Sequence, residues 1–193
     1  MGRAFDYPAG AALARRAFLG AATVLLLCPR SFAQGADFSG FNDVATVAAH
    51  GRTDDLIRIL QGGRTPNVPD DKGETALHYA AQLGNPQMVQ ALLYYKADVD
   101  PRDQFGNTPL HWAAQRGNVT VMQMLIDAKA AIDPQNRQGI TPLMMAAQGG
   151  QAQAVRLLLK DGADPRRADF TGRDVASWAQ GKPAIVQMLR SAK

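Results

Sequence analysis

The sequence predicts an all-α solenoid in which short helix pairs stack on one another. Similar segments recur along the chain at a constant step, from position 75 to 108 to 141, and this period is typical of stacked repeat architectures. Pairs of small alanines recur at the same step, as Ala80-Ala81, Ala113-Ala114 and Ala146-Ala147, and would let neighbouring helices approach closely. Aromatic residues make up 7% of the 193 residues, which suits thin helices better than a large β-sandwich core.

Residues 1–33 predict an export signal. Residues 17–28 carry no charge, and a helix of this length would span roughly 18 Å, short of the ~30 Å hydrocarbon core of a bilayer. Arg15-Arg16 precede this apolar segment, and Ser31-Phe32-Ala33 follows it with small residues at the two positions that a signal peptidase requires. We therefore expect cleavage after Ala33.

The arginine pair predicts the export route. Arg15-Arg16-Ala17-Phe18-Leu19 resembles the twin-arginine motif, in which two arginines are followed one residue later by Phe-Leu. This resemblance implies a bacterial protein delivered to the periplasm. An ordinary secretory signal is the alternative.

Charge and composition exclude several classes of function. Four arginines and one aspartate in residues 1–33 account for three of the four net positive charges, so the charge does not support nucleic-acid binding. The single cysteine, Cys28, excludes an intrachain disulfide framework. The sequence contains no phosphate loop, His-Glu-x-x-His or Gly-x-Ser-x-Gly motif. We expect a monomer that is not an enzyme, uses no cofactor and has no membrane association after signal cleavage.

Residues 104–136 illustrate the internal repeat. Thr108 is expected to cap a helix that begins at Pro109, whose fixed φ suits the first helical position. Gly117 ends this helix, and Asn118 begins a second helix. Met122, Leu125 and Ile126 form the apolar stripe of that second helix, which one helix pair alone cannot bury.

The same pattern defines the other units. Thr75 and Thr141 lie one step before and after Thr108, which gives internal repeats at 71–103, 104–136 and 137–169. Further steps land on Asn42 and Asp174, both helix-capping residue types. Residues 38–70 and 170–193 are therefore expected to form caps at the two ends.

The quoted residues resemble the ankyrin-repeat family. The match is carried by Asp103-x-x-Gly106-x-Thr108-Pro109-Leu110-His111-x-Ala113-Ala114 and by Asp161-Gly162-Ala163-Asp164, and it extends over about residues 38–193. The resemblance implies helix pairs joined by β-turn hairpins. It also implies a non-catalytic scaffold or accessory subunit that binds another protein, here of unknown identity, through its concave face. An assembly factor or chaperone for a periplasmic redox or metal enzyme, which could itself bind a metal or small ligand, is the alternative.

Three groups of polar residues have a structural and a functional interpretation. His78 and His111 occupy equivalent positions and could form a metal column, but Met144 interrupts it and the resemblance implies a structural hydrogen bond. Asp98, Asp100 and Asp133 lack the spacing of a calcium loop and are expected in turns. Asn118-Val119-Thr120 forms a glycosylation sequon, and we expect Asn118 to act as a helix cap instead.

Candidate binding residues fall in three sets of positions that recur from repeat to repeat, which we call columns. The alternative to a binding role is that these side chains pack within the fold or lie in solvated loops. The first column consists of the residue directly after the histidine position in each repeat, and it is rich in aromatic side chains. Aromatic side chains anchor protein partners when they are exposed together. The second lies on the family's variable surface, and the third at the turn tips. The candidates are Tyr79, Trp112, Met145 and Trp178, then Gln82, Leu83, Gln115, Arg116 and Gln148, then Lys72, Glu74, Phe105, Asn107, Arg137, Gln138 and Ile140. Phe105 and Ile140 are expected to be exposed apolar tips.

Overall fold

A computed structural model describes residues 44–191 of the chain. The described residues all belong to one compact unit of the chain, which falls within residues 37–193. Arg15, Arg16, the cleavage position after Ala33 and the capping residue Asn42 lie outside the described residues. None of the described helices is long and apolar enough to cross a membrane.

The described residues form ten helices arranged as five successive pairs. The pairs are α1 (Val44–Ala49) with α2 (Thr53–Gln61), α3 (Ala76–Leu83) with α4 (Pro86–Tyr94), α5 (Pro109–Arg116) with α6 (Val119–Asp127), α7 (Pro142–Gly149) with α8 (Ala152–Lys160), and α9 (Val175–Trp178) with α10 (Pro183–Ser191). The sequence-based prediction of a helical repeat solenoid is confirmed.

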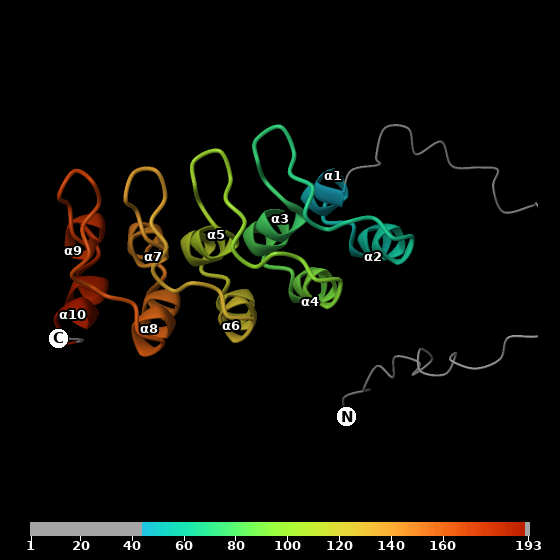
Figure 1. Cartoon of the computed structure of the whole chain (residues 1–193). Coiled ribbons are helices and arrows are strands. Elements are labelled where there is room, and N and C mark those ends of the chain that lie inside the picture. The colour runs from blue at the N-terminus through green and yellow to red at the C-terminus, as the bar shows by residue number, and fades with distance from the viewer. Residues whose placement is uncertain (1–43, 192–193) are drawn as a thin grey trace, which may run out of the picture. The chain divides into compact units, whose positions relative to one another are not determined.

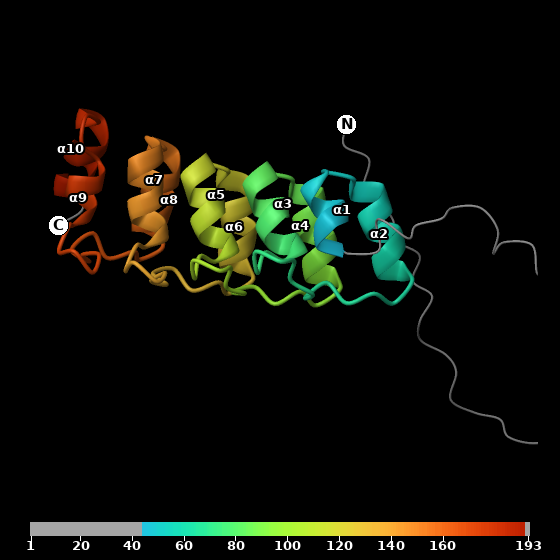
Figure 2. The ribbon, with the colours of Figure 1, turned by 90° about the horizontal axis from the view of Figure 1, so that it is seen from above.

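The helices lie in two rows, which Figures 1 and 2 show from two directions. The inner row consists of α1, α3, α5, α7 and α9, and each of these helices packs against the next one in the row. The outer row consists of α2, α4, α6, α8 and α10, which pack in the same order. Each helix pair therefore packs mainly against its neighbours, as in other solenoids.

Local sequence accounts for the ends of the central helices. Thr108 is extended, and Pro109 occupies the first turn of α5, as predicted. Gly117 ends α5 with φ of 73°, a left-handed conformation that glycine adopts without the steric cost of a Cβ atom. Asn118 precedes α6, but its side chain does not cap this helix; its amide donates to the carbonyl of Ala81 in the preceding repeat at 2.8 Å. Asn118 therefore occupies the N-cap position as predicted, but its side chain links two repeats instead of capping the helix.

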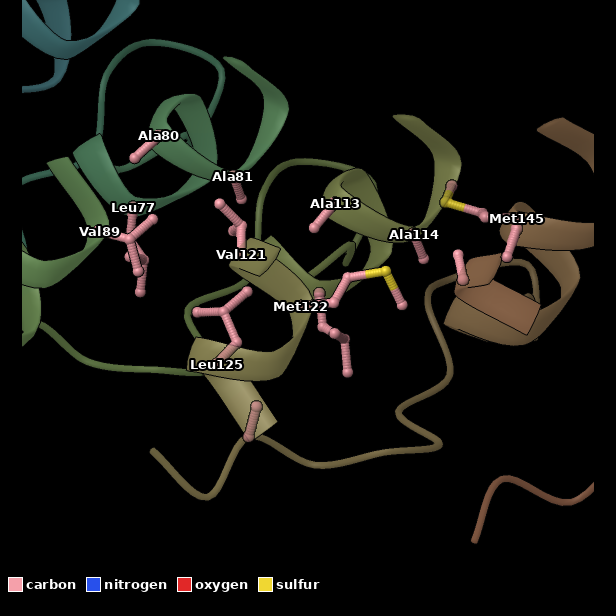
Figure 3. Close-up of a cluster of buried hydrophobic side chains, with 14 of the residues drawn as sticks. Leu77, Ala80, Ala81, Val89, Ala113, Ala114, Val121, Met122, Leu125 and Met145 are labelled. Atoms are coloured by element: carbon pink, nitrogen blue, oxygen red, sulfur yellow. The ribbon is translucent and has the colours of Figure 1, made fainter. Parts of the chain in front are cut away.

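The core lies between the two rows and is continuous from pair to pair (Figure 3). Leu77 and Leu110 of the inner row belong to the same buried cluster as Val89 and Leu125 of the outer row. Burying such a side chain stabilises the fold by about 1.5–3 kcal/mol. The alanine pairs, among them Ala113-Ala114, are completely buried, which agrees with the close approach predicted for inner helices.

A finger-like turn precedes each inner helix from α3 onward, and consecutive fingers are joined through their backbones. We call the segments 70–74, 103–107, 136–140 and 169–173 the fingers. Gly106 has φ of 80°, which the turn requires, as predicted. The Gln104 amide donates to the Lys72 carbonyl at 2.9 Å, and the Arg137 amide donates to the Phe105 carbonyl at 3.0 Å. The fingers thus form one connected edge along the inner row.

Candidate interaction surface

Two buried histidines fix the fingers to the inner helices. His111 is completely buried, and its Nδ1 accepts the backbone N–H of Thr108 at 3.0 Å. Its Nε2 lies 3.0 Å from the Ile140 carbonyl of the next finger. Because Nδ1 accepts and a carbonyl cannot donate, the proton is on Nε2. His78 makes the same contacts with Thr75 and the Asn107 carbonyl.

The histidines are neutral bridges between repeats. Burial disfavours the charged imidazolium, which lowers the pKa of His111 to about 4 and also lowers the pKa of His78. No group of three potential ligands within residues 44–191 could hold a metal ion. Met144 occupies the equivalent position in the third repeat, where it is buried without such a bridge. The structural interpretation of these histidines agrees with their contacts.

The aromatic column is hydrogen-bonded to the fingers. The Tyr79 hydroxyl donates to Asp70 Oδ2 at 2.6 Å, and the indole N–H groups of Trp112 and Trp178 donate to Asp103 and Asp169 at 3.1 Å. Burial and the Asp70 carboxylate raise the pKa of Tyr79. Burial alone would raise the pKa of Asp70, but the bonds from Tyr79 and from backbone N–H groups hold it below its usual value. The three rings are half-buried, and their positions are fixed.

A pocket of about 350 Å³ lies between the first two internal fingers and their inner helices. Six of its lining residues are predicted binding residues. Lys72 and Phe105 lie at the tips of the two fingers, and the other four lie at the base of the first finger or in the inner helices. Its lining residues are Lys72, Glu74, Tyr79, Gln82, Asp103, Gln104, Phe105 and Trp112. The Phe105 side chain is 55% exposed, as predicted for an apolar tip.

Other predicted residues lie outside this pocket, in the fingers and the inner helices. Leu83, Arg116, Arg137, Gln138 and Gln148 are exposed, and Gln115 is half-buried. Leu83 is 52% exposed at the end of α3. We call the surface formed by the fingers and the exposed residues of α3, α5 and α7 the finger face.

Four predicted residues are buried and contribute little surface. Ile140 is 7% exposed, so its predicted role as an exposed tip is wrong: it occupies the base of the finger, where its carbonyl accepts the His111 bond. Asn107 is 3% exposed, and its side-chain amide donates a hydrogen bond to Asp103. Met145 packs into the core, and Glu74 is buried beside Tyr79 at the rim of the pocket.

Two features of the last finger were not predicted. Phe170 is 69% exposed, although Gly139 lies directly beneath its ring, where an added Cβ would come within 2.7 Å of Cδ1. Arg173 places its guanidinium 4.4 Å from the centre of the Trp178 ring. The position of Phe170 between Asp169 and Gly172 is the signal that could have identified it, because Phe105 lies within the same Asp-x-x-Gly pattern.

The turn aspartates connect repeats through backbone amides. Asp100 accepts the amide of Ala131 at 2.9 Å, and Asp133 accepts the amide of Asp164 at 2.8 Å. Asp98 accepts the amide of Asp100 within its own turn. The turn interpretation of these residues agrees with their contacts.

Comparisons with known proteins place these repeats in a family. The curated relatives include "Ankyrin repeat-containing protein P1E11.10" of Schizosaccharomyces pombe, 36% identical over 30% of this chain and 28% of that protein. They also include "Palmitoyltransferase AKR1" of Eremothecium gossypii, 39% identical over 33% of this chain and 9% of that protein. The chain therefore spans less than a third of either relative. The family descriptions "Ankyrin repeats (3 copies)" and "Ankyrin repeat" match residues 44–136 and 138–170, together more than half of the chain, and this chain thus belongs to the ankyrin-repeat family.

Proposed function

We propose that this chain binds another protein through its finger face and acts as a non-catalytic scaffold or accessory subunit in the periplasm. Ankyrin repeats serve in general as protein-interaction modules, and the four matched repeats make that general role the starting point. The similarity covers only a small part of each relative, so it does not extend the activity of either relative to this chain.

The pocket between the first two fingers carries the proposal. Three aromatic side chains, Tyr79, Phe105 and Trp112, meet there. Aromatic groups near the centre of an interface dominate the affinity of many protein complexes. Hydrogen bonds to Asp70 and Asp103 hold two of these rings in place before any partner arrives, which reduces the entropy lost on binding.

Affinity capture from the periplasm, followed by mass spectrometry, identifies the partner. Phe105→Ala, Arg116→Ala and Arg137→Ala, each first checked for unchanged melting, should weaken the captured complex by about 1–3 kcal/mol. Gln90→Ala, Gln123→Ala and Arg156→Ala on the outer helices are the matched controls. If the control variants lose binding while the finger variants keep it, the finger face is not the interface. Capture of a cofactor-containing enzyme would make the chain an assembly factor or accessory subunit of that enzyme.

The proposed location rests on the arginine pair of the N-terminal segment. Changing Arg15 and Arg16 together to lysine preserves the charge but removes the guanidinium groups that the twin-arginine receptor recognises. We expect this double variant to accumulate uncleaved inside the cell, as judged by fractionation and mass. Normal export of the variant would leave an ordinary secretory signal.

A further inference from the structure

The last finger contains a carboxylate and an aromatic ring that together hold a guanidinium group. Arg173 lies 4.4 Å from the centre of the Trp178 ring, and its Nε donates to Asp169 Oδ2 at 2.9 Å. The Trp178 indole N–H donates to the same oxygen at 3.1 Å. The guanidinium thus combines a cation–π contact with a charge-assisted hydrogen bond.

The same carboxylate and ring recur in the first two internal repeats, but the cation does not. Asp103 and Trp112 form the same hydrogen bond at the same spacing, and so do Asp70 and Tyr79. At the positions that correspond to Arg173 in these two repeats, the chain has Glu74 and Asn107. Asn107 is neutral and Glu74 is acidic, so neither supplies a positive charge to these rings. The Asn107 side-chain amide donates to Asp103 Oδ2 at 3.1 Å, in the place of the Arg173 bond, so Glu74 is the pocket carboxylate that an incoming cation would pair with.

The pocket between these two repeats is lined by both charged and aromatic side chains. Glu74 and Asp103 contribute two carboxylates, and Lys72 contributes one ammonium group. Lys72 is exposed and forms no ion pair with any residue of the range 44–191. The exposed Phe105 and the half-buried Trp112 add aromatic surface. A pocket of about 350 Å³ accommodates one long side chain, and its charge favours a cationic one.

We propose that this pocket receives an arginine side chain of the protein partner, which stacks on an aromatic ring as Arg173 does in the last finger and pairs with Glu74. The inference rests on the proposed function, because it names the chemistry of the group that the finger face recognises. Arginine suits the pocket better than lysine, because a planar guanidinium stacks on an aromatic face while its N–H groups bond a carboxylate.

The two tryptophans of the chain provide the test, since each gives one indole N–H signal in an NMR spectrum. The purified exported protein is titrated with N-acetyl-arginine amide and, as a neutral control of matched shape, with N-acetyl-citrulline amide. We expect the Trp112 signal to shift saturably in the millimolar range with the arginine probe. The Trp178 signal should respond much less, because Arg173 covers its ring. The citrulline probe should bind at least ~10-fold more weakly, since it keeps the shape but lacks the charge.

Two variants sharpen the result. Glu74→Gln, which keeps the shape of the side chain, should weaken arginine binding at Trp112 about 5-fold or more, whereas Lys72→Ala should leave it unchanged or stronger. Arg173→Ala should uncover the second ring, so that the Trp178 signal becomes arginine-sensitive. An unshifted Trp112 signal, an equal response to citrulline, or equal binding of N-acetyl-lysine amide would overturn the proposal.

Binding of the captured partner to two variants distinguishes a failure of the arginine pocket from a failure of the finger face as the interface. If Glu74→Gln binds the partner normally while Phe105→Ala does not, the finger face remains the interface and the arginine pocket is wrong. If both variants bind normally, and the outer-helix variants do not, the proposed interface itself is wrong.

Discussion

The finger face and the outer row of helices are held together by different interactions. Consecutive fingers are joined by backbone hydrogen bonds and by the buried His78 and His111 bridges. The outer helices are joined mainly by apolar stripes, in which Leu92, Leu125 and Leu158 are completely buried. Directional bonds fix the positions of side chains more tightly than apolar packing does, so the finger face is the side preorganised for recognition.

Among the substitutions proposed, removal of one histidine bridge should lower the free energy of unfolding most. His111→Met places in the second repeat the residue that the third repeat has at Met144. The Thr108 amide and the Ile140 carbonyl each lose a buried partner, at about 1–3 kcal/mol for each group left without a replacement. We expect the free energy of unfolding in urea to fall by about 2–4 kcal/mol. A loss no larger than that of an ordinary surface substitution, about 0.5 kcal/mol, would show that the bridge adds nothing to the apolar packing.

Acid should weaken the same bridges. The pKa of His111 is about 4 in the folded chain and near 6.5 when unfolded, so the unfolded state binds more protons between these values. The stability from this group is complete above about pH 6.5 and is lost as the pH falls towards 4. The loss is on the order of 3 kcal/mol. Urea unfolding at a series of pH values, with His111→Met as the control, should give a flatter pH dependence for the variant. Parallel curves would contradict this assignment.

A partly buried polar link between the loop before α6 and the inner helix α3 should matter less. Asn118→Ala removes the bond from the side-chain amide to the Ala81 carbonyl, which is only partly buried. We expect a loss of about 1 kcal/mol in the free energy of unfolding. Gln90→Ala, an exposed change on α4, is the control and should stay within about 0.5 kcal/mol of the parent. A larger loss for Asn118→Ala than for His111→Met would contradict the claim that the buried histidine bridges are the stronger links between repeats.

The repeat architecture was predictable because each local signal pointed to the same fold. Thr108, Pro109 and Gly117 fix the ends of one helix through backbone chemistry that depends on neighbouring residues alone. Because equivalent residues recur at a constant spacing, the same helix ends are predicted in the other repeats. The tip residue Phe105 was also predictable, because its turn has the same pattern of Asp and Gly as the other fingers.

The details of the surface depend on contacts between repeats, which the sequence alone does not display. Ile140 resembles an exposed tip in the sequence, but it lies one residue beyond Gly139, where the chain turns back into the core. Asn118 has the residue type of a cap, yet its longer-range bond to Ala81 prevails over the local one. The Arg173 contact with Trp178 likewise requires knowledge of how the finger folds over its helix.

Hydrogen exchange with and without the captured partner tests the central claim most directly, because it reports on both rows of helices in one experiment. We expect slower exchange, on binding, in the fingers 70–74, 103–107 and 136–140 and in the exposed ends of α3 and α5. Exchange in α4, α6 and α8 should remain unchanged. Protection confined to α4, α6 and α8, with unchanged fingers, would contradict the claim that the finger face binds the partner.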